Sequence, residues 1–198
     1  MWPRWRARSL ARLIYTPRLW RLLTVVANHG AGSQVNLRPS WRRGSSLRMK
    51  NLFEAATVEE VKGRMAQLRP DSQRQWGKMN PAQALAHCSA AMEMAVGEKF
   101  PPRILIGLLL GRLAKKSMIV NEKPMPRNSG TDKSLVVNDA RDFVAERQRL
   151  HEFIDRFAAG GPGACTKHPH FFFGPLTPQE WAALMYQHVD HPPRQFQV

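Results

Sequence analysis

From residue 49 onward the chain is punctuated as a series of helices, and no stretch alternates apolar and polar residues in the manner of a strand. Asn80-Pro81 sets a capping residue before a proline at the first helical position, which predicts a helix that runs to about Gly97. Thr177-Pro-Gln-Glu180 has the form of a capping box and predicts the start of the last helix. Several helices joined by loops predict an all-α fold, an antiparallel four-helix bundle with an extra short helix and long loops.

Other signals mark the remaining helices. Thr57-Val-Glu-Glu60 has the form of another capping box, and it predicts a helix that Pro70 stops. The apolar run Ile104–Leu110 is shorter than the about 20 residues that a membrane span needs, so it predicts a buried helix. Asp139 is expected to begin the longest helix, which Gly160-Gly161 ends.

Charge is divided unevenly along the chain. Residues 1–50 hold ten arginines and Lys50 without any Asp or Glu, whereas the other 148 residues hold 19 basic and 15 acidic side chains. We therefore interpret residues 1–48 as a basic, disordered extension and residues 49–198 as the folded domain. The extension is a targeting segment, a tail that binds a membrane surface or nucleic acid, or a stretch upstream of the true start at Met49. The small surplus of charge on that domain indicates solubility and no binding of nucleic acid.

Composition also restricts compartment and chemistry. Two cysteines, Cys88 and Cys165, are too few for a disulfide framework, and they predict a reducing, cytoplasmic location. The sequence holds no phosphate-binding glycine loop, no serine-elbow motif and no Cys-x-x-Cys pair. No apolar stretch is long enough for a membrane span. The partners left open are a small-molecule ligand and a second copy of the chain in a homodimer.

Histidines on two predicted helices are expected to face the interior. His87 lies in the apolar segment PAQALAHCSAAM, in which only Cys88 could also ionise. His188 follows Trp181 by seven residues on the apolar stripe of the last helix, and His191 extends that stripe by one turn. Inward-facing imidazoles from two helices are how helical bundles build metal sites. Core histidines that each make one hydrogen bond would give the same pattern, so the residues alone leave both interpretations open.

Three stretches of residues 49–198 resemble the DinB/YfiT-like superfamily of metalloenzymes. They are WGKMNPAQALAHCSAAMEMAVG (residues 76–97), KPMPRNSGT (residues 123–131) and FFGPLTPQEWAALMYQHVDH (residues 172–191). The resemblance is strongest to a subfamily described only as a domain of unknown function. It implies a four-helix bundle and a divalent metal ion, zinc or nickel, in an enzyme that acts on a small thiol or electrophile.

The metal ligands of that superfamily are one histidine of the second helix and an H-x-x-x-H pair of the last. The resemblance maps the first two onto His87 and His188, but the third falls on Pro192, which cannot coordinate a metal. His191 is then the substitute ligand that the resemblance leaves. Because proline interrupts helices, we expect the last helix to end near Asp190 and His191 to leave helical geometry. The alternative is a degenerate bundle that lost its metal site and serves as a binding or structural module.

Overall fold

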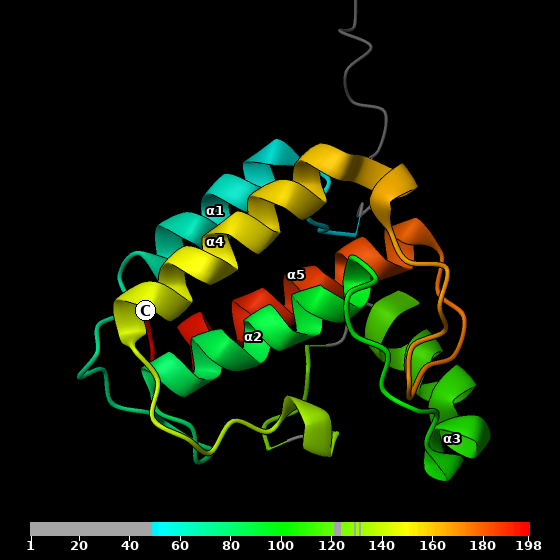
Figure 1. The fold of residues 1–198 in the computed structure, drawn as a ribbon, viewed down its shortest axis with the longest axis horizontal. Coiled ribbons are helices and arrows are strands. Elements are labelled where there is room, and N and C mark those ends of the chain that lie inside the picture. Colours follow the sequence, from blue (N-terminus) through cyan, green and yellow to red (C-terminus); the bar gives the residue numbers. More distant parts are fainter. Residues whose placement is uncertain (1–48, 121–123, 129, 131) are drawn as a thin grey trace, which may run out of the picture. The chain divides into compact units, whose positions relative to one another are not determined.

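The structure is a computed structural model that describes residues 49–198 except residues 121–123, 129 and 131 (Figure 1). Residues 1–48, for which a basic and disordered extension was predicted, lie outside the described residues. The described part contains five α-helices and no strand, and one isolated antiparallel bridge joins His170 to Gly174. The predicted all-α class is confirmed.

The five helices are α1 (Ala55–Met65), α2 (Pro81–Ala95), α3 (Leu105–Lys115), α4 (Phe143–Gly160) and α5 (Pro178–Gln195). α2 packs against α4 and α5, and α1 packs against the same two helices. The core of the domain lies between these four helices (Figure 1). Eight of the twelve largest fully buried side chains come from these helices: Met65, Leu85, Met92, Leu150, Ile154, Phe157, Trp181 and Leu184.

Two of the predicted helix starts are confirmed by their caps. The Asn80 side chain accepts a hydrogen bond from the backbone amide of Gln83 at 2.9 Å, and the Gln83 side chain accepts one from the Asn80 amide at 3.0 Å. Thr177 and Glu180 make the same reciprocal pair at the start of α5. Each cap provides acceptors for amides that the first turn of a helix leaves without an internal partner.

Two other predicted starts are wrong. α1 begins at Ala55, so Thr57 lies inside its first turn and is buried instead of capping the helix. α4 begins at Phe143, four residues after the predicted Asp139, because the side chain of Asp142 caps the helix there. A capping motif fits several nearby starts, and the packing of the first turn decides among them.

α3 stands apart from the other four helices (Figure 1). It continues into a π-helical turn, Lys116–Val120, and this turn packs against α5. The prediction of a helix over Ile104–Leu110 is confirmed, but its predicted burial is wrong, since Leu105 and Leu109 are 80% and 83% exposed. No helix in the described part of the chain is long and apolar enough to cross a membrane.

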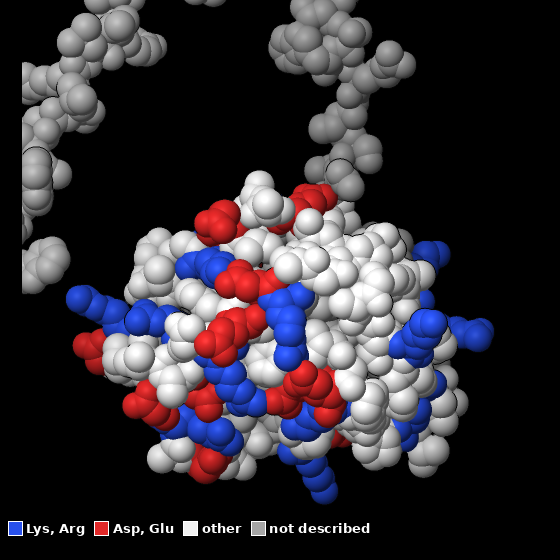
Figure 2. Space-filling view, turned by 45° about the horizontal axis from the view of Figure 1, so that its top comes forward, with Lys and Arg blue, Asp and Glu red and all other residues white. Residues whose placement is uncertain are grey.

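Charged side chains are spread unevenly over the domain. In the view of Figure 2, basic and acidic groups alternate over the left part, whereas the right part is largely uncharged with Lys and Arg along its edge. Ion pairs join neighbouring helices: Arg64 with Asp190 between α1 and α5, Lys62 with Asp155 between α1 and α4, Arg149 with Glu93 between α4 and α2, and Lys115 with Glu180 between α3 and α5. These pairs are partly exposed, so each adds only modestly to stability.

Candidate histidine site

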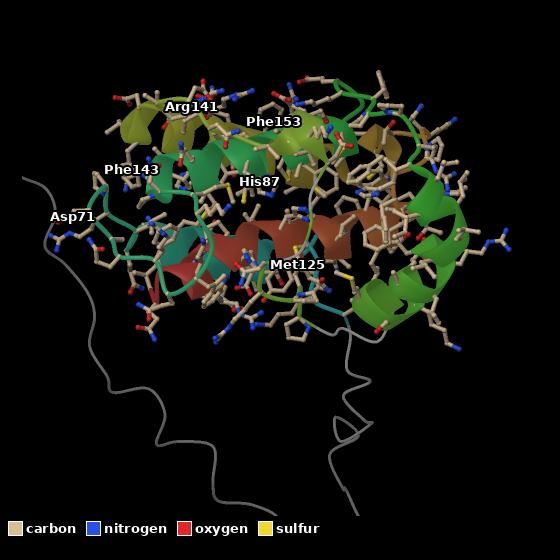
Figure 3. The ribbon with its side chains drawn as sticks, turned by 90° about the horizontal axis from the view of Figure 1, so that it is seen from below. Asp71, His87, Met125, Arg141, Phe143 and Phe153 are labelled. Atoms are coloured by element: carbon tan, nitrogen blue, oxygen red, sulfur yellow. The ribbon has the colours of Figure 1, made fainter. Side chains whose placement is uncertain are left out.

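His87 of α2 and His188 of α5 lie beside one another. Their ring centroids are 6.0 Å apart and their planes differ by 33°. The packing of α2 against α5 brings the two imidazoles together, with His87 on the side of α2 that faces α5 (Figure 3). Ala84 and Ala91, one turn to either side of His87, have small side chains that leave room beside its ring. Both histidines are mostly buried, and each keeps a small exposed fraction.

The hydrogen bonds of the two rings fix their tautomers. His87 Nδ1 lies 2.9 Å from the carbonyl oxygen of Leu135, and His188 Nδ1 lies 3.2 Å from that of Leu184. A carbonyl can only accept, so each Nδ1 carries the proton and each neutral ring has a free lone pair on Nε2. Metal-binding histidines are commonly oriented in the same way: the ring nitrogen that does not bind the metal donates a hydrogen bond to a carbonyl oxygen.

Burial keeps the histidines of this region neutral. Burial and, to a smaller degree, His87 and His191 together lower the pKa of His188 to about 3. Burial also lowers the pKa of His87, against the effect of its bond to Leu135, and it lowers the pKa of His191. Neutral imidazole is the form that binds a metal ion, so no proton has to leave these rings before an ion binds at neutral pH.

α5 does not end where Pro192 was expected to end it. The helix continues to Gln195, so the prediction of an end near Asp190 is wrong. Pro192 has no amide hydrogen for the carbonyl of His188, one turn earlier. That carbonyl instead accepts a hydrogen bond from the thiol of Cys88, at 3.2 Å. A donor on α2 thus replaces the bond that the proline removes from α5.

His191 therefore stays within the helix. Its ring meets Trp76 edge to face, with 5.9 Å between centroids, and the guanidinium of Arg127 lies 4.4 Å from the centroid of the Trp76 ring. Burial lowers the pKa of His191, and His87 lowers it further. All three stretches that carry the family resemblance meet here.

The third imidazole is not joined to the other two. Among the residues that the structure describes, no three His, Cys, Asp or Glu side chains are arranged to hold one ion. His87 and His188 form a pair, while His191 is turned toward Trp76. Of the three histidines predicted as ligands, the structure places His87 and His188 side by side and His191 against Trp76.

His170, which is buried against Trp181 of α5, was not among the predicted ligands. Its Nδ1 accepts from the amides of Phe172 and Phe173 at 3.1 and 3.3 Å, so its proton resides on Nε2. Within the described part of the chain, that buried Nε2 has no hydrogen-bond partner. Burial, with a smaller contribution from His188, lowers the pKa of His170 to about 3. In the sequence, only the aromatic run that follows His170 could have indicated its burial, and such a run predicts packing without any particular chemistry.

The fold and the paired neutral histidines define an all-helical protein with a compact imidazole site. By its sequence the chain belongs to the DUF1569 family of proteins of unknown function, whose family model matches residues 41–197. The match includes all five helices and the three histidines, and it confirms the predicted similarity to a domain of unknown function. No curated protein and no solved structure matches the chain.

Proposed function

We propose that this protein is a DinB-like enzyme that binds a divalent metal ion, zinc or nickel, and acts on a small thiol or electrophile. His87 and His188 are its first two ligands. The observation that carries the proposal is the hydrogen bonding of the pair: both Nδ1 atoms are committed to carbonyls, so both Nε2 lone pairs are free. A bound divalent ion would supply the means to lower the pKa of a coordinated thiol or water.

The packing of the helices supports the DinB-like fold. α1 and α2 each contact both α4 and α5, which is the closed pattern of neighbours in a four-helix bundle. α3 lies outside that pattern and corresponds to the extra short helix. Both cysteines are free thiols, which supports a cytoplasmic location for the enzyme.

His191 is the third ligand that we assign to this site. It follows His188 by three residues in an intact helix, and residues at this spacing lie on the same face. To join the pair, its side chain must leave the edge of Trp76. Trp76 and Arg127 then flank the site from the loop side and are the groups that a small ligand would meet first.

One observation favours the alternative, a degenerate bundle without catalysis. The third imidazole contacts Trp76, and the described residues contain no complete group of three ligands. If the Trp76 contact is permanent, the histidine pair is a structural element of a binding module. The two functions differ in whether the protein takes up a metal ion.

Calorimetric titration of the chelator-treated full chain with zinc and with nickel tests the proposal. We expect one ion per chain, loss of binding in His87→Ala and in His188→Ala, and weaker binding in His191→Ala. His168→Ala is the matched control, because His168 is an exposed histidine outside the site. A parent protein that binds neither metal, or a His87→Ala variant that binds as the parent does, would refute the metal proposal.

A gain-of-function variant and an activity assay complete the test. Position 192 is buried, one turn after His188 in an intact helix, so Pro192→His adds an imidazole in the register of the missing ligand and should strengthen zinc binding. For the reaction itself, we expect the zinc-loaded parent to accelerate the addition of glutathione to N-ethylmaleimide. With the zinc-treated His87→Ala variant, the addition should proceed only at the uncatalysed rate.

A further inference from the structure

The largest exposed apolar surface of the described domain is on α3. Six of its aliphatic side chains are about half exposed or more: Leu105, Ile106, Leu108, Leu109, Leu110 and Leu113. Together they expose on the order of 700 Å², which exceeds the largest apolar patch of a typical monomer. Elsewhere in the described part only Phe100, Val136 and Val144 are exposed large hydrophobic residues, and they are scattered. An exposed apolar surface of this size usually marks a site that binds a protein, a membrane or a ligand.

Glycines explain why the leucines point outward. Gly107 and Gly111 form the side of α3 that faces the protein, and an added Cβ at Gly107 would lie 2.6 Å from the carbonyl oxygen of Phe172. Leu109 and its neighbours one turn to either side occupy the opposite side of the helix. A helix that is apolar around most of its circumference is usually buried. Here the glycine side is used for the contact with the domain, and the leucine side is presented outward.

The charged side chains of α3 and of the residues that flank it are all basic. Residues 99–120 contain no Asp or Glu, and Arg103, Arg112 and Lys116 are exposed. Lys115 is different, because it pairs with Glu180 at 3.0 Å. Arg112 and Lys116 each follow a leucine of the outer side by three residues, so they lie on the same side of the helix as the apolar side chains. The basic edge on the right of Figure 2 agrees with this distribution.

We propose that α3 docks the protein on an anionic membrane surface. Leu105, Leu109 and Leu113 enter the boundary between headgroups and acyl chains, while the exposed basic side chains contact lipid phosphates. Apolar side chains flanked by Lys and Arg are the composition of helices that lie in the membrane interface. Long basic side chains can keep their charge at the headgroups while their stems lie along apolar groups. At eleven residues α3 lies on the membrane and does not cross it.

A second copy of the chain fits this surface less well. Two α3 helices packed together would bring their basic groups near one another, and residues 99–120 offer no acidic side chain to pair with them. Leu108 and Leu110 lie on opposite flanks of the helix, so one partner helix would leave one of them uncovered. A lipid surface can reach both flanks and supplies the complementary charge. The proposal does not depend on the histidine site.

Vesicle cosedimentation of the full chain tests the docking. The probes are vesicles of phosphatidylcholine alone and vesicles that also contain phosphatidylserine, and we expect the parent to bind only the second. Leu109→Ser with Leu113→Ser should reduce binding by at least about tenfold. Arg112→Gln with Lys116→Gln should reduce it by about tenfold or more at low salt. Val136→Ser with Val144→Ser is the matched control, since it removes two exposed aliphatic side chains from other elements and should change nothing.

Residues 1–48 are the same in every variant, so any binding that they cause is a constant background. A leucine double variant that sediments with the vesicles as the parent does overturns the proposal. It is also overturned if the parent is a dimer in light scattering that the leucine substitutions dissociate while vesicle binding is unchanged, because the second copy is then the occupant. Circular dichroism of each variant verifies that the helices are retained.

Discussion

The thiol of Cys88 donates a hydrogen bond to the main-chain carbonyl of His188, with 3.2 Å between sulfur and oxygen. In an uninterrupted helix this carbonyl would accept from the amide of residue 192, but Pro192 has no amide hydrogen. The bond therefore crosses from α2 to α5 at the point where α5 lacks an internal donor. Positions 88 and 192 are coupled in consequence, although they are far apart in the sequence.

The first prediction tests that coupling. Cys88→Ala removes the donor and leaves a carbonyl without a partner, so the free energy of unfolding should fall by about 1–3 kcal/mol. Pro192→Ala supplies a backbone amide to the same carbonyl. In that background we expect Cys88→Ala to cost about 0.5–1.5 kcal/mol less, measured by urea denaturation of the four proteins. Equal costs in both backgrounds would show that the thiol does not replace the missing bond.

A second prediction concerns thiol reactivity. Burial raises the pKa of Cys88 to about 12 and that of Cys165 to about 11. Because the thiolate is the reactive form, both should react slowly with iodoacetamide at neutral pH. Cys165 is only partly buried and should react first, whereas Cys88 should react only when the protein unfolds. Mass spectrometry of the parent and of Cys165→Ser distinguishes the two sites, and rapid labelling of Cys88 in the folded protein would contradict the prediction.

The third prediction is a dependence of stability on pH. Burial lowers the pKa of His170 from its ordinary value of 6.5 to about 3. Between these values the unfolded chain binds a proton at this site and the folded chain does not. The contribution of His170 is therefore complete above pH 6.5, and it decreases by about 1.4 kcal/mol per pH unit as the pH falls from about 6 to about 3.

His170→Asn isolates this contribution, because the asparagine oxygen can accept from the same backbone amides that His170 Nδ1 accepts from. We expect the slope of unfolding free energy against pH to become shallower in this variant between pH 6 and pH 4, by about the amount of one titrating histidine. His168→Asn changes an exposed histidine two residues away and should keep the slope of the parent. Parallel slopes for the His170 variant and the parent would contradict the prediction.

Local contacts explain which features the sequence could predict. Asn80 and Thr177 mark helix starts because each contacts an amide three residues later, so the whole motif is visible in a short window. The approach of His87 to His188 was predictable as well, because helical spacing places both on interior faces. These predictions need no knowledge of the distant chain.

The features that could not be predicted depend on distant partners. α5 passes through Pro192 because a thiol from α2 bonds to the carbonyl of His188, and no window around the proline contains that thiol. The turn of His191 toward Trp76 likewise requires a loop that is remote in sequence. The apolar run of α3 has the composition of a buried helix, and only the contact of its glycines with Phe172 shows which side faces the domain.

The last prediction compares two glycines in helices. Gly63 lies in the exposed part of α1 with nothing near an added Cβ, so Gly63→Ala should stabilise the protein by about 0.5–1 kcal/mol through its helix propensity. Gly107 faces the backbone of Phe172, and its added Cβ would lie 2.6 Å from that carbonyl oxygen. Gly107→Ala must therefore displace α3 or the segment beneath it, at a cost of about 1–3 kcal/mol.

Thermal unfolding and hydrogen exchange of the α3 amides measure both effects. We expect a higher midpoint and unchanged exchange for Gly63→Ala, against a lower midpoint and faster exchange within α3 for Gly107→Ala. The propensity gain of alanine is the same in both helices, so the difference between the variants reports only the contact with Phe172. If Gly107→Ala raised the midpoint as Gly63→Ala does, α3 would not pack on this backbone, and the outward direction of its leucines would lose its explanation.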